Sequence, residues 1–236
     1  NNSTTAYDLA LIGIAAYKND WIRETMALEK APVYLDDVMT DTRDIDMNKV
    51  EGVTEDISLK KAWHLMRDRG DVTLPVLDNG KLSGIISLGD IAHAYMDVYD
   101  NCILATAKTT YKNILETLDA KMVVGDENGH FASGEVVIAT SNPDCLEEYI
   151  HKGDMVIVGN RYENQLCAIE LGAACIIISM GAKVSQTIQN FAKERNCIII
   201  STPYDSFTVA RLINQSMSIG YFMKRDKLTT FKVTDK

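Results

Sequence analysis

A serine and an aspartate, three residues apart, stand where an apolar run ends and a helical pattern begins. The stretch is GIISLGD, and its two polar side chains are Ser87 and Asp90. At a helix start, a serine oxygen can accept from a backbone N–H, and a carboxylate is favoured by the positive end of the helix dipole. The same two groups can instead hold a ribose, with the helix N-terminus facing phosphate. The spacing leaves both alternatives open.

A second polar group follows another predicted strand. Gly159, Asn160 and Arg161 come directly after the apolar run MVIV and before a helical pattern. Sheets of parallel strands bind ligands at the carboxyl ends of the strands, where these residues would lie. The stretch is therefore a candidate second ligand site, with a plain structural turn as its alternative.

The composition argues against two classes of partner. The chain has 236 residues, of which 33 are acidic and 24 are basic, giving a formal net charge of −9. A field of this sign repels a phosphate backbone, so we expect no nucleic acid partner. No apolar run approaches the roughly 18 residues that a membrane helix needs, so we expect no membrane partner.

The cysteines indicate a compartment. There are five, an odd number, and none of them shows the C-x-x-C spacing of a metal or redox site. Cys175 and Cys197 lie in strand-like apolar runs, where a free cysteine behaves as a small buried hydrophobic residue. We therefore expect reduced cysteines and a cytoplasmic location.

Residues 50–99 predict a small α/β unit in the order strand, helix, strand, hairpin, strand, helix. Gly70 is expected to end the first helix, and Asn79-Gly80 predicts a tight hairpin turn. The run TLPVL contains a proline, Pro75, which predicts a strand start or an edge strand. The apolar residues of the first helix share one face: Leu59, Ala62, Trp63 and Met66.

From about residue 120 to residue 202, short apolar runs alternate with helical patterns. Continuous apolar strands that alternate with helices indicate a largely parallel sheet covered on both faces. Gly153, Gly172 and Asn196 are expected to follow the ends of three helices. TPYDSFTVARLINQS, residues 202–216, predicts one more helix.

Two stretches resemble known families. Residues 50–99 resemble a cystathionine-β-synthase-type (CBS) domain, through VTEDISLKKAW and TLPVLDNGKLSGIISLGDI. Residues 100–217 resemble the DRTGG domain, with IISTPYDSFTVARLINQS as the most specific match. The motif that names this domain is degraded to GNRYENQ, which keeps Arg161, and SMGAKVS. Together they resemble the regulatory insert of the nucleotide-controlled, manganese-dependent family II inorganic pyrophosphatases.

The resemblance implies an α/β fold, in which a CBS-type βαββα module is joined to a Rossmann-like DRTGG module with a mostly parallel sheet. The expected parts are an N-terminal helical segment of unclear origin, a CBS domain, a DRTGG domain and the start of a truncated second CBS domain. Their expected bounds are 1–34, 35–100, 101–217 and 218–236. APVYLDDV, residues 31–38, predicts a short strand and a turn.

The resemblance also implies a ligand. In the CBS family, an S/T-x-x-D pair at this place binds the ribose and phosphate of an adenine nucleotide, which favours that role for Ser87 and Asp90. The regulator would be AMP, ADP, ATP or a dinucleoside polyphosphate. By the same resemblance, five further residues are candidates for nucleotide binding: Val53, Thr54, Thr73, Pro75 and Ile86. The alternative for these residues is a purely structural role in strand packing or in a turn.

One loop departs from the family pattern. Asp71 and Val72 stand where the related pyrophosphatases are expected to carry a basic residue. An acidic residue near a nucleotide phosphate is unfavourable by about 1 kcal/mol, depending on screening. A dimerisation module with a decayed nucleotide site is therefore an alternative to a nucleotide sensor.

The catalytic motifs of that family are not in this sequence. Neither H-x-N-P-D-x-D nor D-H-H is present, and SNPD, residues 141–144, lacks the histidine. The four histidines are scattered, so no cluster of imidazoles and carboxylates for two manganese ions can be assembled. We expect no catalytic residue and no metal site in this chain, and manganese only in the catalytic part of a parent enzyme. The remaining alternative to a separate regulatory region is that this chain is part of an intact pyrophosphatase enzyme.

The CBS resemblance further implies a protein partner. A lone CBS module exposes an apolar sheet face, which normally packs against a second copy. If the second CBS domain is missing or truncated, that copy comes from another chain. We therefore expect a homodimer through the CBS domains.

Overall fold

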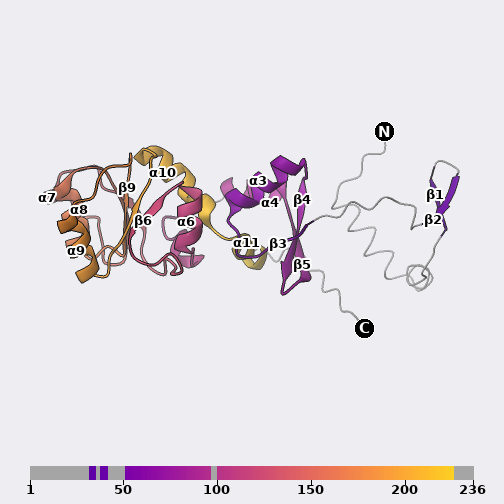
Figure 1. The fold of residues 1–236 in the computed structure, drawn as a ribbon, viewed down its shortest axis with the longest axis horizontal. Helices are drawn as coiled ribbons and strands as arrows, with labels where there is room; N and C mark the ends of the chain where they lie inside the picture. Colours follow the sequence, from indigo (N-terminus) through magenta and orange to yellow (C-terminus); the bar gives the residue numbers. More distant parts are fainter. Residues whose placement is uncertain (1–31, 36–37, 42–50, 97–99, 226–236) are drawn as a thin grey trace. The chain divides into compact units, whose positions relative to one another are not determined.

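The structure, a computed structural model, describes residues 32–35, 38–41, 51–96 and 100–225 (Figure 1). The chain divides into two units, Asn1–Lys49 and Val50–Lys236, which are considered separately. In the first unit, β1 (Pro32–Leu35) and β2 (Val38–Asp41) pair antiparallel. β1 confirms the strand predicted over 31–38, whereas β2 was not predicted. The helical character predicted for residues 1–34 lies outside the described residues, apart from β1.

The second unit begins with a three-stranded module, residues 51–96. Its sheet has the order β3-β4-β5, with β3 parallel to β4 and β4 antiparallel to β5. The predicted order of strands and helices is confirmed. The elements are β3 (Val53–Thr54), α3 (Leu59–Arg69), β4 (Thr73–Asp78), β5 (Lys81–Ser87) and α4 (Leu88–Met96).

Local sequence signals explain the ends of these elements. The Ser58 hydroxyl caps α3 by accepting from the backbone N–H of Lys61 at 3.1 Å. Gly70 ends the helix in the left-handed region with a φ of 74°, as predicted. Asn79 and Gly80, with φ values of 49° and 77°, form the predicted turn between β4 and β5.

The position predicted for the proline strand was wrong. β4 is the central strand of its sheet, although Pro75 suggested a strand start or an edge. The reason is the shortness of β3, which pairs only with Val76 and Leu77. Pro75 lies opposite Ile85 of β5 and comes before this pairing begins, so its missing N–H removes no bond to β3.

Residues 100–216 form a five-stranded module with the sheet order β6-β10-β9-β8-β7. Strands β7 to β10 are parallel, and β6 pairs antiparallel with β10, which confirms the mostly parallel sheet. The strands are β6 (Lys121–Val124), β7 (Val136–Ile138), β8 (Met155–Val158), β9 (Cys175–Ile178) and β10 (Ile198–Ser201). The helices are α5 (Ile103–Thr106), α6 (Tyr111–Thr117), α7 (Pro143–Leu146), α8 (Tyr162–Glu170), α9 (Gln186–Glu194), α10 (Ser206–Leu212) and the 3-10 helix η2 (Ile213–Ser216).

Two hydrophobic cores lie on opposite faces of this sheet. In β9, Cys175 and Ile177 belong to one core, and Ile176 and Ile178 belong to the other. Helices α8 and α9 pack on the second core, whereas α6 and α10 lie on the opposite side (Figure 1). The alternation of buried side chains therefore produces the predicted three-layer arrangement.

Two predicted helix ends need correction. Gly172 and Asn196 follow α8 and α9 with positive φ, as predicted, but α7 ends at Leu146, well before Gly153. The N–H of His151 donates instead to the buried Asp154 carboxylate at 2.7 Å, which holds this segment in a turn. The helix predicted over 202–216 is also divided, into α10 and η2.

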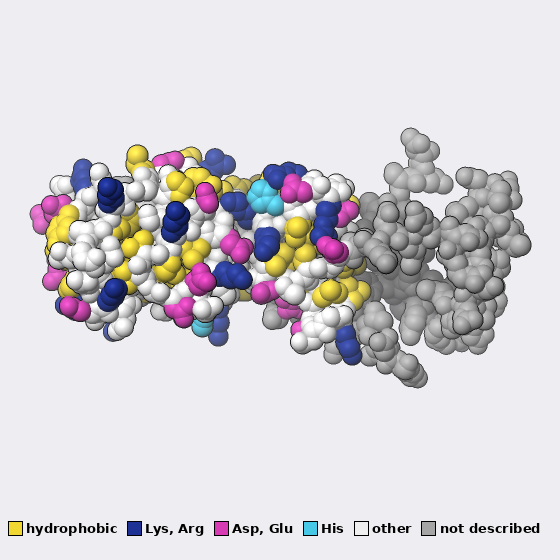
Figure 2. All heavy atoms as spheres, in the orientation of Figure 1, with side chains coloured by type: hydrophobic (Ala, Val, Ile, Leu, Met, Phe, Trp, Pro, Cys, Tyr) yellow, Lys and Arg dark blue, Asp and Glu magenta, His cyan; other side chains and the backbone are white. Residues whose placement is uncertain are grey.

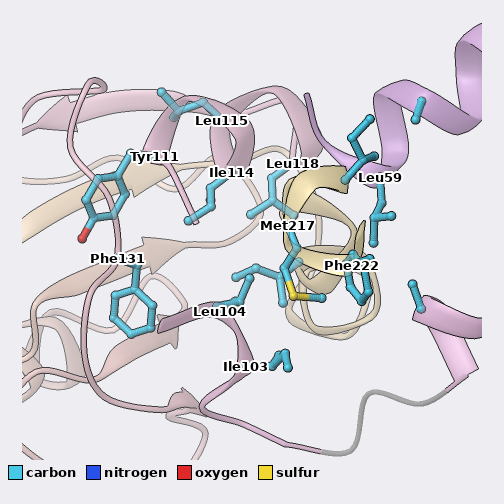
Figure 3. Packing of buried hydrophobic residues seen from close by; sticks show 14 of the residues in the cluster. Leu59, Ile103, Leu104, Tyr111, Ile114, Leu115, Leu118, Phe131, Met217 and Phe222 are labelled. Atoms are coloured by element: carbon cyan, nitrogen blue, oxygen red, sulfur yellow. The ribbon is translucent and has the colours of Figure 1, made fainter. Parts of the chain in front are cut away.

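A continuous hydrophobic core joins the two modules. Leu59 of α3 and Leu118 after α6 belong to the same cluster as Met217 and Phe222 (Figure 3). Met217 leads into α11 (Ile219–Arg225), and α11 packs against β5 of the three-stranded module. Of the tail expected to begin a second CBS domain, residues 218–225 therefore contain a helix, and 226–236 lie outside the described residues.

The surface carries charges of both signs. Acidic, basic and apolar side chains are interspersed over the face in view (Figure 2). Among the described residues, no helix has the length and apolar character needed to cross a membrane.

Candidate functional site

Ser87 and Asp90 form a reciprocal cap at the start of α4. The Asp90 N–H donates to the Ser87 hydroxyl oxygen at 3.2 Å. The Ser87 N–H and hydroxyl both donate to Asp90 Oδ2, at 2.7 and 2.6 Å. The capping alternative is therefore confirmed, and it involves the two polar side chains that would bind a ribose. Both residues are half-buried, so they remain partly open to solvent.

Four of the predicted nucleotide-binding residues lie on one face of the three-stranded sheet. Leu74 and Val76 of β4 are buried beneath the helices, so their neighbours Thr73 and Pro75 point to the opposite face. We call this the outer sheet face. Leu77, two residues further along β4, points the same way, and the register adds Ser87 opposite Thr73, Ile85 opposite Pro75 and Thr54 opposite Leu77. The outer sheet face thus comprises Thr54, Thr73, Pro75, Leu77, Ile85 and Ser87.

The structure separates two predicted residues from this group. The side chains of Val53 and Ile86 are buried, with 7% and 0% of their surface exposed, and they pack in the core beneath the helices. They can offer a ligand only their backbone groups. Thr54 is exposed, and its hydroxyl donates to the Asp56 carboxylate.

The loop with Asp71 and Val72 abuts the start of α4. The N–H of Leu88 donates to the Val72 carbonyl at 2.9 Å, and the N–H of Asp71 donates to the Met66 carbonyl at 2.9 Å. The end of α3 and the start of α4 thus hold the loop beside Ser87. The Val72 side chain is 64% exposed, so it is accessible to a molecule on the outer sheet face.

The second predicted group lies at the carboxyl edge of the five-stranded sheet. Arg161 is the N-cap residue of α8, and both Asn160 and Arg161 are exposed. The Gln165 side chain donates to the Gly159 carbonyl at 2.9 Å, which accounts for the shape of this turn. Ser179, from the loop after β9, lies at the same edge and accepts from Ser206 at 3.2 Å.

No metal cluster is found in the described ranges 51–96 and 100–225: no three side chains of the His, Cys, Asp or Glu type lie close enough together to hold an ion.

Sequence reasoning missed the contacts that hold the turn after β3. Ser83 donates to Glu55 Oε1 at 2.7 Å, and Asn113 donates to the Asp56 carbonyl at 2.9 Å. The partners are 28 and 57 residues apart, so no local pattern could have indicated them.

Two family models match the chain. The CBS domain matches residues 36–97, and the DRTGG domain matches residues 113–216. A solved structure of the CBS and DRTGG domains of the regulatory region of Clostridium perfringens pyrophosphatase is 37% identical, with a TM-score of 0.73 and a coverage of 82% of both chains. The chain belongs to these CBS–DRTGG regulatory regions.

The CBS–DRTGG region also matches complete enzymes. The cobalt-dependent inorganic pyrophosphatase of Clostridium perfringens is 36% identical over 225 residues, which are 95% of this chain and 41% of that protein. The probable manganese-dependent inorganic pyrophosphatase of Thermotoga maritima is 28% identical over 201 residues, 85% of this chain and 37% of that protein. The chain spans about two fifths of the length of these relatives. The predicted family resemblance is confirmed.

Proposed function

We propose that this chain is a regulatory module that binds an adenine nucleotide at the outer sheet face. The observation that carries the proposal is the Ser87–Asp90 pair at the start of α4, with Thr73 directly opposite Ser87. The related Clostridium perfringens region supports the ligand class, because its solved structure is a complex with an activator, diadenosine tetraphosphate. AMP, ADP and ATP carry the same adenosine group.

The chemistry of the pair suits a ribose. A carboxylate accepts hydrogen bonds only, and the serine hydroxyl can donate or accept, so together they match the two hydroxyls of a ribose. Asp90 Oδ2 already accepts two bonds from Ser87. A ribose hydroxyl would take the place of the Ser87 hydroxyl on this oxygen, while the first turn of α4 would face the phosphate.

The regulated reaction is part of the proposal. The related enzymes are inorganic pyrophosphatases with a cobalt or manganese requirement. We propose that the whole protein hydrolyses diphosphate with a divalent metal, for which manganese is our choice, and that nucleotide binding here controls the rate. The free state of all five cysteines supports a cytoplasmic setting.

Titration calorimetry with AMP, ADP, ATP and diadenosine tetraphosphate tests nucleotide binding. Ser87→Ala and Asp90→Ala should each weaken nucleotide binding by about 5- to 150-fold, because removing one partner of a ribose hydrogen bond costs about 1–3 kcal/mol. Thermal unfolding of the same variants without ligand measures the contribution of the helix cap separately. Loss of the cap should lower the free energy of unfolding by about 1 kcal/mol.

Two results would contradict the site. Lost stability with unchanged affinity would mean that Ser87 and Asp90 only cap α4. Wild-type protein that binds none of the four nucleotides would support the alternative, a dimerisation module with a decayed site.

The second group, Gly159, Asn160 and Arg161, is proposed as a second site, and Arg161→Ala would then lower the number of nucleotides bound.

We also propose a homodimer through the three-stranded module. The outer sheet face exposes Ile85, with 47% of its surface accessible. On the helical side, a cavity of about 690 Å³ lies between α3, α4 and η2, and its wall includes Trp63, Leu88, Ile91 and Tyr95. Trp63 and Tyr95 are 40% and 50% exposed, although Trp63 shares the helix face with buried residues. Apolar surface of this kind favours burial against a second copy.

A further inference from the structure

The turn Glu55–Ser58 directly follows Thr54 of the outer sheet face and is bound by the start of α11. The Gly220 N–H donates to the Glu55 carbonyl at 2.9 Å, and the Ile219 N–H donates to the Ile57 carbonyl at 3.0 Å. The Leu59 N–H donates in turn to the Met217 carbonyl at 2.9 Å. Hydrogen bonds therefore tie this segment, which leads out of the five-stranded module, directly to the turn.

A buried side chain of the five-stranded module makes a second link. Asn113 Nδ2 donates to the Asp56 carbonyl at 2.9 Å, and only 6% of Asn113 is exposed. The Asn113 N–H donates to the Thr110 hydroxyl, which caps α6. Asn113 is therefore fixed at the start of α6, and its side-chain amide binds α6 directly to the backbone of the turn.

The same turn is tied to the sheet that carries the proposed nucleotide site. Ser83 of β5 donates to the Glu55 carboxylate at 2.7 Å, and Thr54 donates to the Asp56 carboxylate. A ligand that contacts Thr54 or orders β5 thus acts on a segment whose carbonyls are held by α6 and α11.

A cleft borders the turn on one side. A polar cleft of about 180 Å³ lies beside it, and its lining includes Asp56, Lys61, Glu116 and Asn128. The ion pair across this junction, Lys61 with Glu116, spans 3.8 Å between exposed side chains, so it adds little rigidity. The turn is thus bordered on this side by a polar cleft and a weak pair.

We propose that the turn Glu55–Ser58 couples nucleotide binding to the five-stranded module, with Asn113 as the positioning residue that links the turn to α6. The inference rests on the proposed nucleotide site. Coupling requires that the bound nucleotide favours one position of the turn, and it is reciprocal: a change imposed on the turn must alter nucleotide affinity.

Amide hydrogen exchange on the full chain, with and without saturating AMP or diadenosine tetraphosphate, tests the link. In the wild type, the nucleotide should change the exchange rates of α6 amides by threefold or more. Asn113→Ala should abolish this change while nucleotide affinity stays within threefold. Asn128→Ala is the matched control, because Asn128 lines the same cleft and its side chain donates to Asp126 of its own turn.

A second variant tests the reciprocal effect through the other link. A Cβ at Gly220 would lie 2.9 Å from the Glu55 Cβ and 3.0 Å from the Glu55 carbonyl oxygen, so in Gly220→Ala the turn and the start of α11 cannot keep their present separation. We expect Gly220→Ala to lower the nucleotide affinity fivefold or more, although α11 carries none of the proposed ligand contacts. This measurement also stands if Asn113→Ala folds poorly.

The outcomes separate the two proposals. Wild-type protein that binds no nucleotide overturns the nucleotide site and the coupling with it. Nucleotide binding that leaves α6 exchange unchanged in the wild type, or that changes it equally in Asn113→Ala, overturns the coupling alone. Unchanged affinity in a folded Gly220→Ala variant also overturns the coupling.

Discussion

At the scale of single residues, the outer sheet face combines a cap with a proposed ligand site. The Ser87 hydroxyl lies 2.6 Å from Asp90 Oδ2, and in the proposed complex a ribose hydroxyl replaces it on this oxygen. Nucleotide binding would thus exchange an internal hydrogen bond for bonds to the ligand. Because such an exchange gains little net free energy, phosphate contacts should contribute strongly to the choice of nucleotide.

Val72 tests where the phosphates lie. Val72→Lys should strengthen ATP binding more than AMP binding, because the added charge would offset the repulsion from Asp71 by about 1 kcal/mol at this exposed position. The gain should shrink as salt rises. Calorimetry with AMP and ATP at low and high salt measures it, and the wild type should prefer AMP. An AMP-to-ATP ratio that stays the same in both proteins would place the phosphates away from this loop.

The buried thiols predict a loss of stability at alkaline pH. Burial raises the pKa of Cys197 to about 12 and that of Cys175 well above its usual value. Because the unfolded thiol ionises near pH 9, the stability from each thiol is complete below that pH and is lost as pH rises towards the folded pKa. The loss is about 1.4 kcal/mol per pH unit for each group.

Urea unfolding from about pH 8 to pH 10 measures this loss. Cys197→Ala should make the decrease less steep than in the wild type. Cys145→Ala is the control, because Cys145 is exposed and should leave the slope unchanged. Equal slopes in Cys197→Ala and the wild type would show that Cys197 does not ionise on unfolding in this range.

At the scale of elements, helix ends depend on whether the local signal has a competitor. Gly70 ends α3 where the sequence predicted, and its N–H donates to the Arg67 carbonyl. Gly153 resembles a helix end in sequence, but α7 ends at Leu146, and the buried Asp154 carboxylate accepts from the N–H groups of His151 and Glu135, which holds the segment before Gly153 in a turn. A buried acceptor thus competes with the local helix-end signal at Gly153.

Gly70 offers a direct measurement of a backbone effect. Gly70→Ala should lower the free energy of unfolding by about 1 kcal/mol, because an L side chain at a φ of 74° is strained even though no atom lies within 4 Å of the added Cβ. Gly159→Ala is the matched control, since its Cβ also meets nothing within 4 Å and its φ does not lie in the positive range. Chemical denaturation compares the two, and equal losses would mean that strain at Gly70 is not the cause.

At the scale of the whole molecule, one core joins the two sheets of residues 51–96 and 100–225. Leu59, Leu118 and Phe222 come from different modules and from α11, yet they pack in a single cluster (Figure 3). A shared apolar core makes the modules stabilise each other, and it gives the turn Glu55–Ser58 a firm support on one side.

If the chain forms the proposed homodimer, its molecular mass in solution should depend on the exposed apolar residues of the three-stranded module. Sedimentation across a dilution series should show a dimer for the wild type. Ile85→Glu or Tyr95→Glu should weaken it by roughly tenfold or more, because a charge would be buried in the interface. The first variant tests the outer sheet face, and the second tests the face of α3 and α4.

Phe207→Glu is the control for this measurement. Phe207 is 70% exposed but lies on α10 of the five-stranded module, so its replacement should leave the mass unchanged. A monomeric wild type, or dissociation caused by Phe207→Glu alone, would contradict a dimer through the three-stranded module.

The sequence by itself determined the features that depend on neighbours along the chain. The hairpin at Asn79-Gly80, the cap at Ser87 and the alternation of apolar strands with helices follow from φ preferences, side-chain hydrogen bonds and burial patterns over a few residues. These signals were sufficient for the α/β class, whereas the resemblance to the CBS and DRTGG domains rests on longer stretches such as TLPVLDNGKLSGIISLGDI. They also located the proposed ribose pair, because its two residues are only three positions apart.

Only the tertiary structure decided which distant segments meet. Pro75 became part of a central strand because β3 stops short of it, and α11 packed against β5 although well over a hundred residues separate them. The bond from Asn113 to Asp56 spans 57 positions, and the bond from Thr202 to Leu118 spans 84. Such contacts depend on the free energy of packing whole faces together, which no short stretch of sequence specifies.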